Sequence, residues 1–174
     1  MSESPAKQRL APAGKVRALA DAKRRADPVF SDFQLADSPL YLIVRIAGQY
    51  SMDMEDALRE TGLDLPSWRA LMILHETNPS SVSEIAEASV TRLSTMTRVV
   101  QRLEKQQYVT LSRRDSDARV TEVFITERGE EVAKRGRRVA SRIFSAAFSD
   151  FPAHEISALN ELLRRVYGHL TGQR

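Results

Sequence analysis

Apolar residues recur every three or four positions over most of the chain, which is the spacing that places them on one face of an α-helix. The first such stripe follows Ser38-Pro39, a pair that favours a helix start because the first turn needs no amide hydrogen from proline. Gly62 follows the last turn and favours its end. The stripe consists of Leu42, Ile46, Tyr50, Met54 and Leu58. This pattern predicts one long helix.

Three shorter helices are predicted in the next part of the chain. The first covers 66–77 and ends before Asn78-Pro79, because a proline biases the preceding residue away from helix. The second begins at Ser83 and the third at Ser94, with a tight turn between them. The third helix has an apolar face and a polar face. Two short helices joined in this way predict a helix-turn-helix.

From residue 109 the pattern changes to one typical of strands. Two β-prone runs, 109–112 and 120–125, flank a charged tip that is rich in turn residues, which predicts a hairpin. Thr126 then caps a long helix, and Pro152 opens a last helix whose broad apolar face requires a partner. The predicted fold class is therefore mainly α with a small β-wing: a winged helix-turn-helix with a further helical region.

The first part of the chain, residues 1–36, is polar and contains several prolines. The first dozen residues are expected to be disordered, and the stretch 15–25 alternates basic and apolar residues as a short helix does. This segment is interpreted as a flexible or partly helical N-terminal arm. A solvated tail and an arm that adds dimer or DNA contacts both remain open.

The charge of the chain is concentrated where the predicted motif lies. Residues 92–119 carry seven basic and three acidic residues, a net charge of +4, whereas the whole chain carries +3. A cationic segment on a nearly neutral body is typical of a DNA-contacting surface. In a winged helix-turn-helix the second helix enters the major groove, where hydroxyl, amide and guanidinium groups can bond to base edges. The polar residues predicted on that helix are Ser94, Thr95, Thr97, Arg98, Gln101 and Arg102.

The hairpin offers a second set of cationic side chains. Arg113, Arg114 and Arg119 are suited to phosphates or to the negative potential of a narrow minor groove. A solvated basic face is the alternative for all of these arginines.

The composition excludes several other classes of function. The chain has no cysteine, which removes disulfides, thiolate nucleophiles and cysteine-based zinc sites, and it has no P-loop or dinucleotide-binding motif. We therefore expect neither an enzyme nor a cofactor. No apolar run approaches the ~20 residues that span a bilayer, and no signal peptide is evident, so we expect a cytoplasmic protein without membrane contact. His75, His154 and His169 are far apart, and metal binding by them with carboxylates is only an alternative.

At this point the sequence resembles the multiple antibiotic resistance regulator (MarR) family. The resemblance rests on four segments, which together are specific although each alone is weak. They are 83–87 (SEIAE), 94–105 (STMTRVVQRLEK), the wing from Arg113 to Arg119, and 125–129 (ITERG). The order of the predicted helices agrees over about residues 38–170. Gln107 departs from the family pattern, which usually has glycine there, and such a position often requires a positive φ. The wing tip is also shorter than usual.

The resemblance implies a homodimer that places one reading helix of each subunit on a pseudo-palindromic operator in double-stranded DNA. It implies that 37–62 and 127–174 form a dimerisation region and that 63–126 form the DNA-binding domain. It also implies that Asp117 pairs with Arg119 and directs that arginine into the minor groove. Many relatives lose DNA affinity when a small anionic aromatic compound or its thioester binds.

The resemblance thus predicts a repressor that an aromatic acid, phenolic compound or thioester releases from DNA. Tyr50 and Trp68 lie on helices that would border the effector cavity, and Arg45 or His75 could meet an anionic group there. Plain core packing or a surface charge explains these four residues equally well. Two rival functions remain open: a regulator that binds DNA without responding to a ligand, and a winged helix used only for protein contacts.

Overall fold

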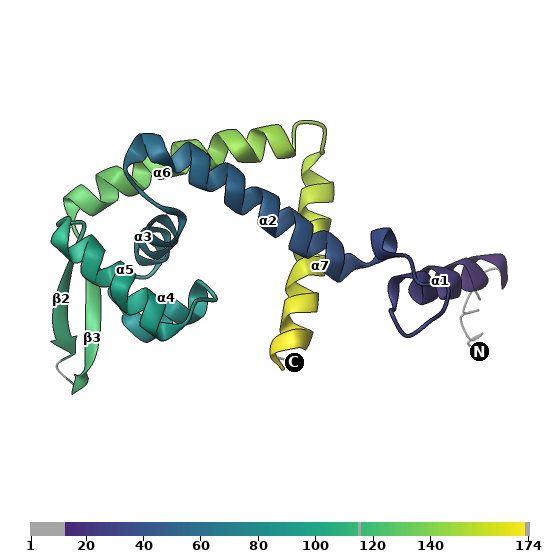
Figure 1. The fold of residues 1–174 in the computed structure, drawn as a ribbon, viewed down its shortest axis with the longest axis horizontal. Coiled ribbons are helices and arrows are strands. Elements are labelled where there is room, and N and C mark those ends of the chain that lie inside the picture. Colours follow the sequence, from purple (N-terminus) through teal and green to yellow (C-terminus); the bar gives the residue numbers. More distant parts are fainter. Residues whose placement is uncertain (1–12, 115, 173–174) are drawn as a thin grey trace, which may run out of the picture. The chain divides into compact units, whose positions relative to one another are not determined.

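The computed structural model describes residues 13–114 and 116–172, and its fold is shown in Figure 1. The chain divides into two compact units, 1–52 and 53–174, which are described in turn. Helix α2 (Pro39–Leu58) crosses the division between them. It begins at the predicted proline, and the carbonyl of Ser38 accepts a hydrogen bond from the amide of Leu42 at 3.1 Å. The first predicted helix is therefore present with the expected start, but α2 ends at Leu58, and a 3₁₀ turn leads from there to Gly62.

The first unit contains helix α1 (Ala13–Ala26) and a short 3₁₀ turn, η1 (Leu35–Asp37), ahead of α2. Ion pairs connect the end of α1 to the segment that follows it: Arg24 with Asp32 at 3.2 Å, and Arg25 with Asp37 at 2.9 Å. The helix predicted over 15–25 is thus present in the N-terminal arm. The residues expected to be disordered, the first dozen, lie outside the described part of the chain.

The second unit is mainly helical with a small sheet. Its elements after α2 are η2 (Arg59–Thr61), α3 (Leu65–Glu76), β1 (Ser80–Ser81), α4 (Val82–Ala88), α5 (Leu93–Lys105), β2 (Val109–Arg114), β3 (Asp117–Ile125), α6 (Glu127–Ala147) and α7 (Ala153–Thr171). The strands form an antiparallel sheet in the order β1-β3-β2. The predicted hairpin is β2–β3, with Val109 opposite Ile125. Strand β1, paired through Ser80 and Ser81, was not predicted because two residues carry no periodicity.

The core of the second unit is aliphatic. It joins α3, α4, α5 and α6 to the inner face of the sheet. Its largest fully buried side chains are Met54, Leu58, Leu71, Leu74, Ile85, Met96, Val100, Leu103, Val109, Val123, Val132 and Val139. Gly129 and Gly136 allow α6 to approach this core closely, because a Cβ at Gly129 would clash with the carbonyl of Tyr108 and one at Gly136 with the indole of Trp68.

Helix starts in the second unit differ from the predicted ones by one residue. Helix α3 begins at Leu65 because the carboxylate of Asp64 caps it, accepting a hydrogen bond from the amide of Ser67 at 3.0 Å. Helix α4 begins at Val82 rather than Ser83. Its cap is Ser81, which forms a reciprocal capping box with Glu84.

Two further caps bear on the sequence predictions. Helix α5 begins at Leu93 rather than Ser94, and its N-cap position, Arg92, makes no side-chain cap bond. The predicted cap at Thr126 is confirmed, because its Oγ1 accepts a hydrogen bond from the amide of Gly129 at 3.0 Å.

Gln107 has the positive φ that its position in the sequence suggested. Its φ of 62° lies in the left-handed region, at the turn between α5 and β2. The turn is held from α6: the hydroxyl of Thr126 donates to the carbonyl of Gln107 at 2.8 Å, and Arg128 donates to the Gln107 side chain at 3.3 Å. Val90, between α4 and α5, also has a positive φ of 52°.

Helix α7 has none of its described residues buried. Along one side it exposes a row of large apolar side chains at helical spacing: Leu159, Leu162, Leu163, Val166, Tyr167 and Leu170. The predicted broad apolar face is therefore present and accessible. In the described part of the chain, no helix is both long and apolar enough to cross a membrane.

Candidate nucleic-acid interface

Helix α5 presents one apolar and one polar face. Met96, Val99, Val100 and Leu103 are buried in the core. On the opposite side Ser94, Thr95, Arg98 and Gln101 are exposed together. Thr97 is half-buried, and its hydroxyl donates to the carbonyl of Leu93 at 2.8 Å within the helix. Core packing thus fixes which side of α5 faces solvent, and that side carries the predicted reading residues.

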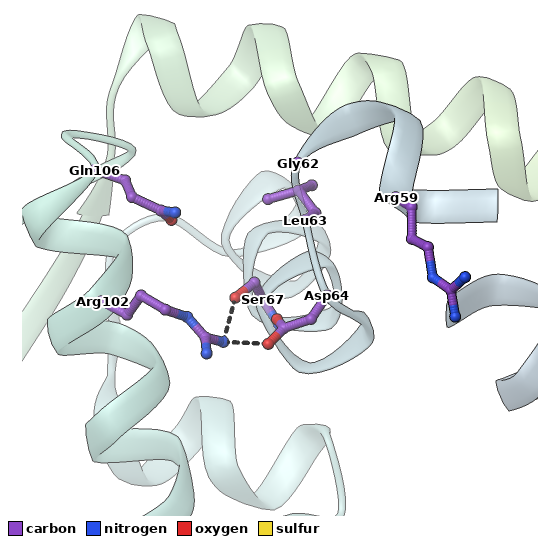
Figure 2. A pocket seen from close by; sticks show the side chains of 7 residues that line it. All are labelled: Arg59, Gly62, Leu63, Asp64, Ser67, Arg102 and Gln106. Atoms are coloured by element: carbon purple, nitrogen blue, oxygen red, sulfur yellow. Dashed lines mark hydrogen bonds and ion pairs between the residues drawn. The ribbon is translucent and has the colours of Figure 1, made fainter. Parts of the chain in front are cut away.

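Arg102 differs from the other predicted residues on α5 because it has partners inside the protein. Its Nη2 donates to Oδ2 of Asp64 at 2.5 Å and to Oγ of Ser67 at 2.8 Å, as Figure 2 shows. This group lies at a cavity of about 360 Å³. The residues lining the cavity are Arg59, Gly62, Leu63, Asp64, Ser67, Arg102 and Gln106.

Asp64 and Ser67 were not among the sequence-predicted site residues. The segment Asp64-Leu-Pro-Ser67 is a recognisable helix-start signal, so the cap between them could have been predicted. Their contact with Arg102, 38 residues away, depends on tertiary packing and has no local signal.

In the wing, Asp117 binds the backbone amide and the Nε of Arg119, while most of the Arg119 side chain stays exposed. Oδ1 of Asp117 accepts hydrogen bonds from the backbone amide of Arg119 at 3.0 Å and from its Nε at 3.2 Å. The Arg119 side chain is 92% exposed. The pairing that the family resemblance implied is therefore present. Arg113 is also exposed.

Arg114, in contrast, is occupied by acidic neighbours. Its Nε donates to Glu122 at 2.7 Å, and its Nη2 lies 3.7 Å from a carboxylate oxygen of Glu84 on α4. The hydrogen bond to Glu122 raises the pKa of Arg114 above its ordinary value. The backbone amide of Ser81, which donates to Glu84, lowers the pKa of that carboxyl. Arg114 therefore joins the wing to α4 through ion pairs.

Two of the predicted effector-binding residues lie in the first unit. Arg45 is exposed, and its guanidinium lies 5.9 Å from the ring centre of Tyr41, one helical turn earlier on α2. Tyr50 is half-buried. Neither lines the cavity of Figure 2.

The other two lie in the second unit, on α3. Trp68 packs against Gly136 of α6, and its buried Nε1 has no hydrogen-bond acceptor within the described part of the chain. His75 pairs through Nδ1 with Glu130 of α6, at 3.0 Å. Arg137, which sequence reasoning missed, also has a buried nitrogen, Nη1, without an acceptor. Among the described residues, no three histidine, aspartate or glutamate side chains are grouped to hold a metal ion.

Comparisons with known proteins agree with this geometry. The MarR family model matches residues 63–121, which contain α3, the helix-turn-helix and most of the wing. The HTH-type transcriptional repressor IacR of Pseudomonas putida is 35% identical over 144 residues, which are 83% of this chain and 86% of the relative.

Among the solved structures that share the fold are the following two. A MarR family regulator from Silicibacter pomeroyi superposes with a TM-score of 0.72 and 22% identity, over 78% of this chain and 92% of that one. CouR of Rhodococcus jostii, solved bound to p-coumaroyl-CoA, gives a TM-score of 0.70 and 21% identity over 76% and 94%. The winged helix of the second unit, the family match and the relative covering most of the chain lead to one conclusion. The protein belongs to the MarR family and is a transcriptional repressor of that family rather than an enzyme.

Proposed function

We propose that this repressor acts as a homodimer that reads a pseudo-palindromic operator and is released by a small anionic effector. The observation that carries the proposal is the polar face of α5, where Ser94, Thr95, Arg98 and Gln101 are exposed together. Such a helix fits the major groove, where arginine can bond guanine and glutamine can bond adenine. Arg119 and Arg113 of the wing would add contacts to the minor groove or to phosphates. Acting on DNA, the repressor would work in the cytoplasm.

The exposed apolar row on α7 supports the homodimer. Soluble proteins rarely leave a continuous row of large apolar side chains uncovered, and such a row marks an interaction surface. A second copy of the chain would cover it with the same surface, as in a two-fold symmetric interface. Under this proposal 37–62 and 127–174 form the dimerisation region, and 63–126 form the DNA-binding domain.

Two buried donors support an anionic effector. Among the described residues, neither Nε1 of Trp68 nor Nη1 of Arg137 has a hydrogen-bond acceptor although both are buried, and the Trp68 indole lies against Gly136. A buried donor without a partner costs free energy, so a carboxylate or phenolate that accepted from them would bind favourably. CouR was solved with p-coumaroyl-CoA, an aromatic thioester. Arg45, Tyr50 and His75 stay predictions as further effector contacts.

The effector is tested on the protein–DNA complex. Aromatic acids, phenols and their coenzyme A thioesters are titrated into repressor bound to fluorescent operator, and anisotropy reports release. The chain has one tryptophan, so quenching of Trp68 fluorescence follows binding directly. We expect one of these classes of compound to quench Trp68 fluorescence and release the DNA. Release requires that the compound bind the free repressor more tightly than the DNA-bound repressor, because a ligand shifts an equilibrium only by its differential affinity for the two states. An effector that saturates the protein and leaves operator affinity unchanged contradicts the proposal.

A further inference from the structure

Arg102 bridges α5 to the start of α3. Its Nη2 donates to Asp64, the N-cap of α3, and to Ser67 in the first turn of that helix. Asp64 serves both helices at once: Oδ1 caps α3 through the amide of Ser67, and Oδ2 accepts from Arg102. Ser67 is only 2% exposed, whereas the side chains of Arg102 and Asp64 are 47% and 45% exposed, so the buried end of this group of contacts is Ser67. These contacts fix the Arg102 guanidinium at a rigid point of the domain.

The same contacts set Arg102 apart from the DNA-reading residues of α5. Both arginines are exposed, but Arg98, one helical turn earlier, has no acidic partner among the described ion pairs. Arg102 has its positive charge balanced by Asp64 at 2.5 Å. A phosphate would have to displace a charge-assisted bond that is already formed. In Figure 2 the guanidinium of Arg102 is directed toward Asp64 and Ser67, across the cavity from Arg59.

We propose that Arg102 and Asp64 are positioning residues: their bond orients α5 for the operator, and Arg102 does not neutralise a phosphate. This inference rests on the proposed reading of DNA by α5. The buried side chains of α5 determine which face of the helix is exposed. The bond between Arg102 and Asp64 then sets the position of α5 relative to the start of α3. Base contacts need closely defined donor and acceptor positions, whereas phosphate contacts tolerate small shifts. Loss of the bond should therefore affect selectivity more than general affinity for DNA.

The test compares Arg102→Gln, Asp64→Asn and the double variant with Arg113→Gln, which removes an exposed wing arginine proposed to contact a phosphate. Asparagine caps helices as well as aspartate does, so Asp64→Asn preserves the start of α3 while weakening the ion pair. Anisotropy measures the affinity of each protein for operator and for scrambled DNA over a salt series, and thermal unfolding confirms that each is folded. The salt dependence counts neutralised phosphates, which separates a positioning residue from a contacting one.

Each single change at Arg102 or Asp64 should weaken operator binding on the order of tenfold, and the double variant should be no weaker than the singles, because both remove one bond. Their salt slopes should equal that of the wild type, whereas Arg113→Gln should reduce the slope by about 1.

Two results would overturn the inference while leaving the proposed function intact. One is a reduced salt slope for Arg102→Gln, equal to that of Arg113→Gln. The other is tighter operator binding by Asp64→Asn, since that would mean that Asp64 merely holds Arg102 away from a phosphate. A wild-type protein that fails to prefer its operator contradicts the proposed function itself.

Discussion

Asp117 holds Arg119 by two hydrogen bonds to a single carboxylate oxygen, one from the backbone amide and one from Nε, while 92% of the Arg119 side chain stays exposed. An exposed ion pair of this kind contributes little to stability, typically under ~1 kcal/mol. The ion pair instead orients the Arg119 side chain, because Asp117 holds its Nε in place before the protein binds DNA. The wing therefore presents one oriented arginine.

Arg119→Ala should weaken operator binding on the order of tenfold and reduce the salt slope by about 1. Asp117→Asn should also weaken operator binding, even though it removes a negative charge from a DNA-facing surface. The direction of this change in operator affinity is informative, because loss of a negative charge by itself would make DNA binding tighter. Anisotropy with operator and scrambled DNA measures both variants. If Asp117→Asn bound operator more tightly than the wild type, the orienting role of Asp117 would be wrong.

A charge placed in the apolar row of α7 should separate the subunits. Leu163→Glu puts a carboxylate into the proposed interface, where burying an unpaired charge is costly, so the dimer should dissociate at concentrations where the wild type is dimeric. Sedimentation or light scattering measures the mass. Ser157→Glu adds the same charge on the opposite side of α7 and serves as the control. Equal masses for the two variants would mean that the apolar row of α7 is not the dimer interface.

The capping box of α4 should make part of the stability dependent on pH. The Ser81 amide lowers the pKa of Glu84 in the folded protein, so Glu84 stabilises the fold fully above the ordinary glutamate pKa of 4.5. This contribution is lost as the pH falls through the lowered folded-state pKa. Glu84→Gln should therefore differ most from the wild type at neutral pH and least in strong acid. Urea denaturation over this range measures it.

Glu87→Gln is the matched control for that experiment, because Glu87 is an exposed glutamate of the same helix and takes no part in the cap. Its stability should follow the wild type at every pH. A Glu84→Gln curve parallel to the wild type would mean that the cap does not depend on the charge.

Gln107→Gly should be more stable than Gln107→Ala by about 1 kcal/mol, because a Cβ is strained at a φ of 62°. Both variants lose the side-chain bond to Arg128, so their difference isolates the backbone. The bond from Thr126 to the carbonyl at this position should survive in both. Thermal or urea unfolding measures the difference. Equal stabilities would show that the turn relaxes when the side chain is shortened.

Local sequence patterns predicted the helices and the hairpin of this chain, but they did not predict ion pairs between residues far apart in the sequence. The alternation of Met96, Val99 and Val100 with Ser94 and Arg98 predicted both the helix and its exposed face, because 3.6-residue periodicity is local. The ion pairs that Arg102 and Arg114 form with acidic side chains could not be predicted, since the partners become neighbours only on folding.

Short signals likewise gave helix starts only to within a residue. Asp64 and Ser81 cap α3 and α4, whereas the sequence favoured positions slightly later, because several residues of these segments are capable of capping. Gln107 shows the opposite case: it replaces the glycine of the family pattern, which left a different turn geometry open, yet it keeps a positive φ of 62° that no local preference of glutamine suggests.

The most direct test of the account is fluorescence anisotropy of the purified protein on the DNA upstream of its own gene, with a scrambled duplex and a salt series. The account predicts selective binding by two chains per operator, a steep salt dependence, and half-sites about one helical turn apart. Equal affinity for the scrambled duplex at every salt concentration, or binding of a single chain, would contradict it.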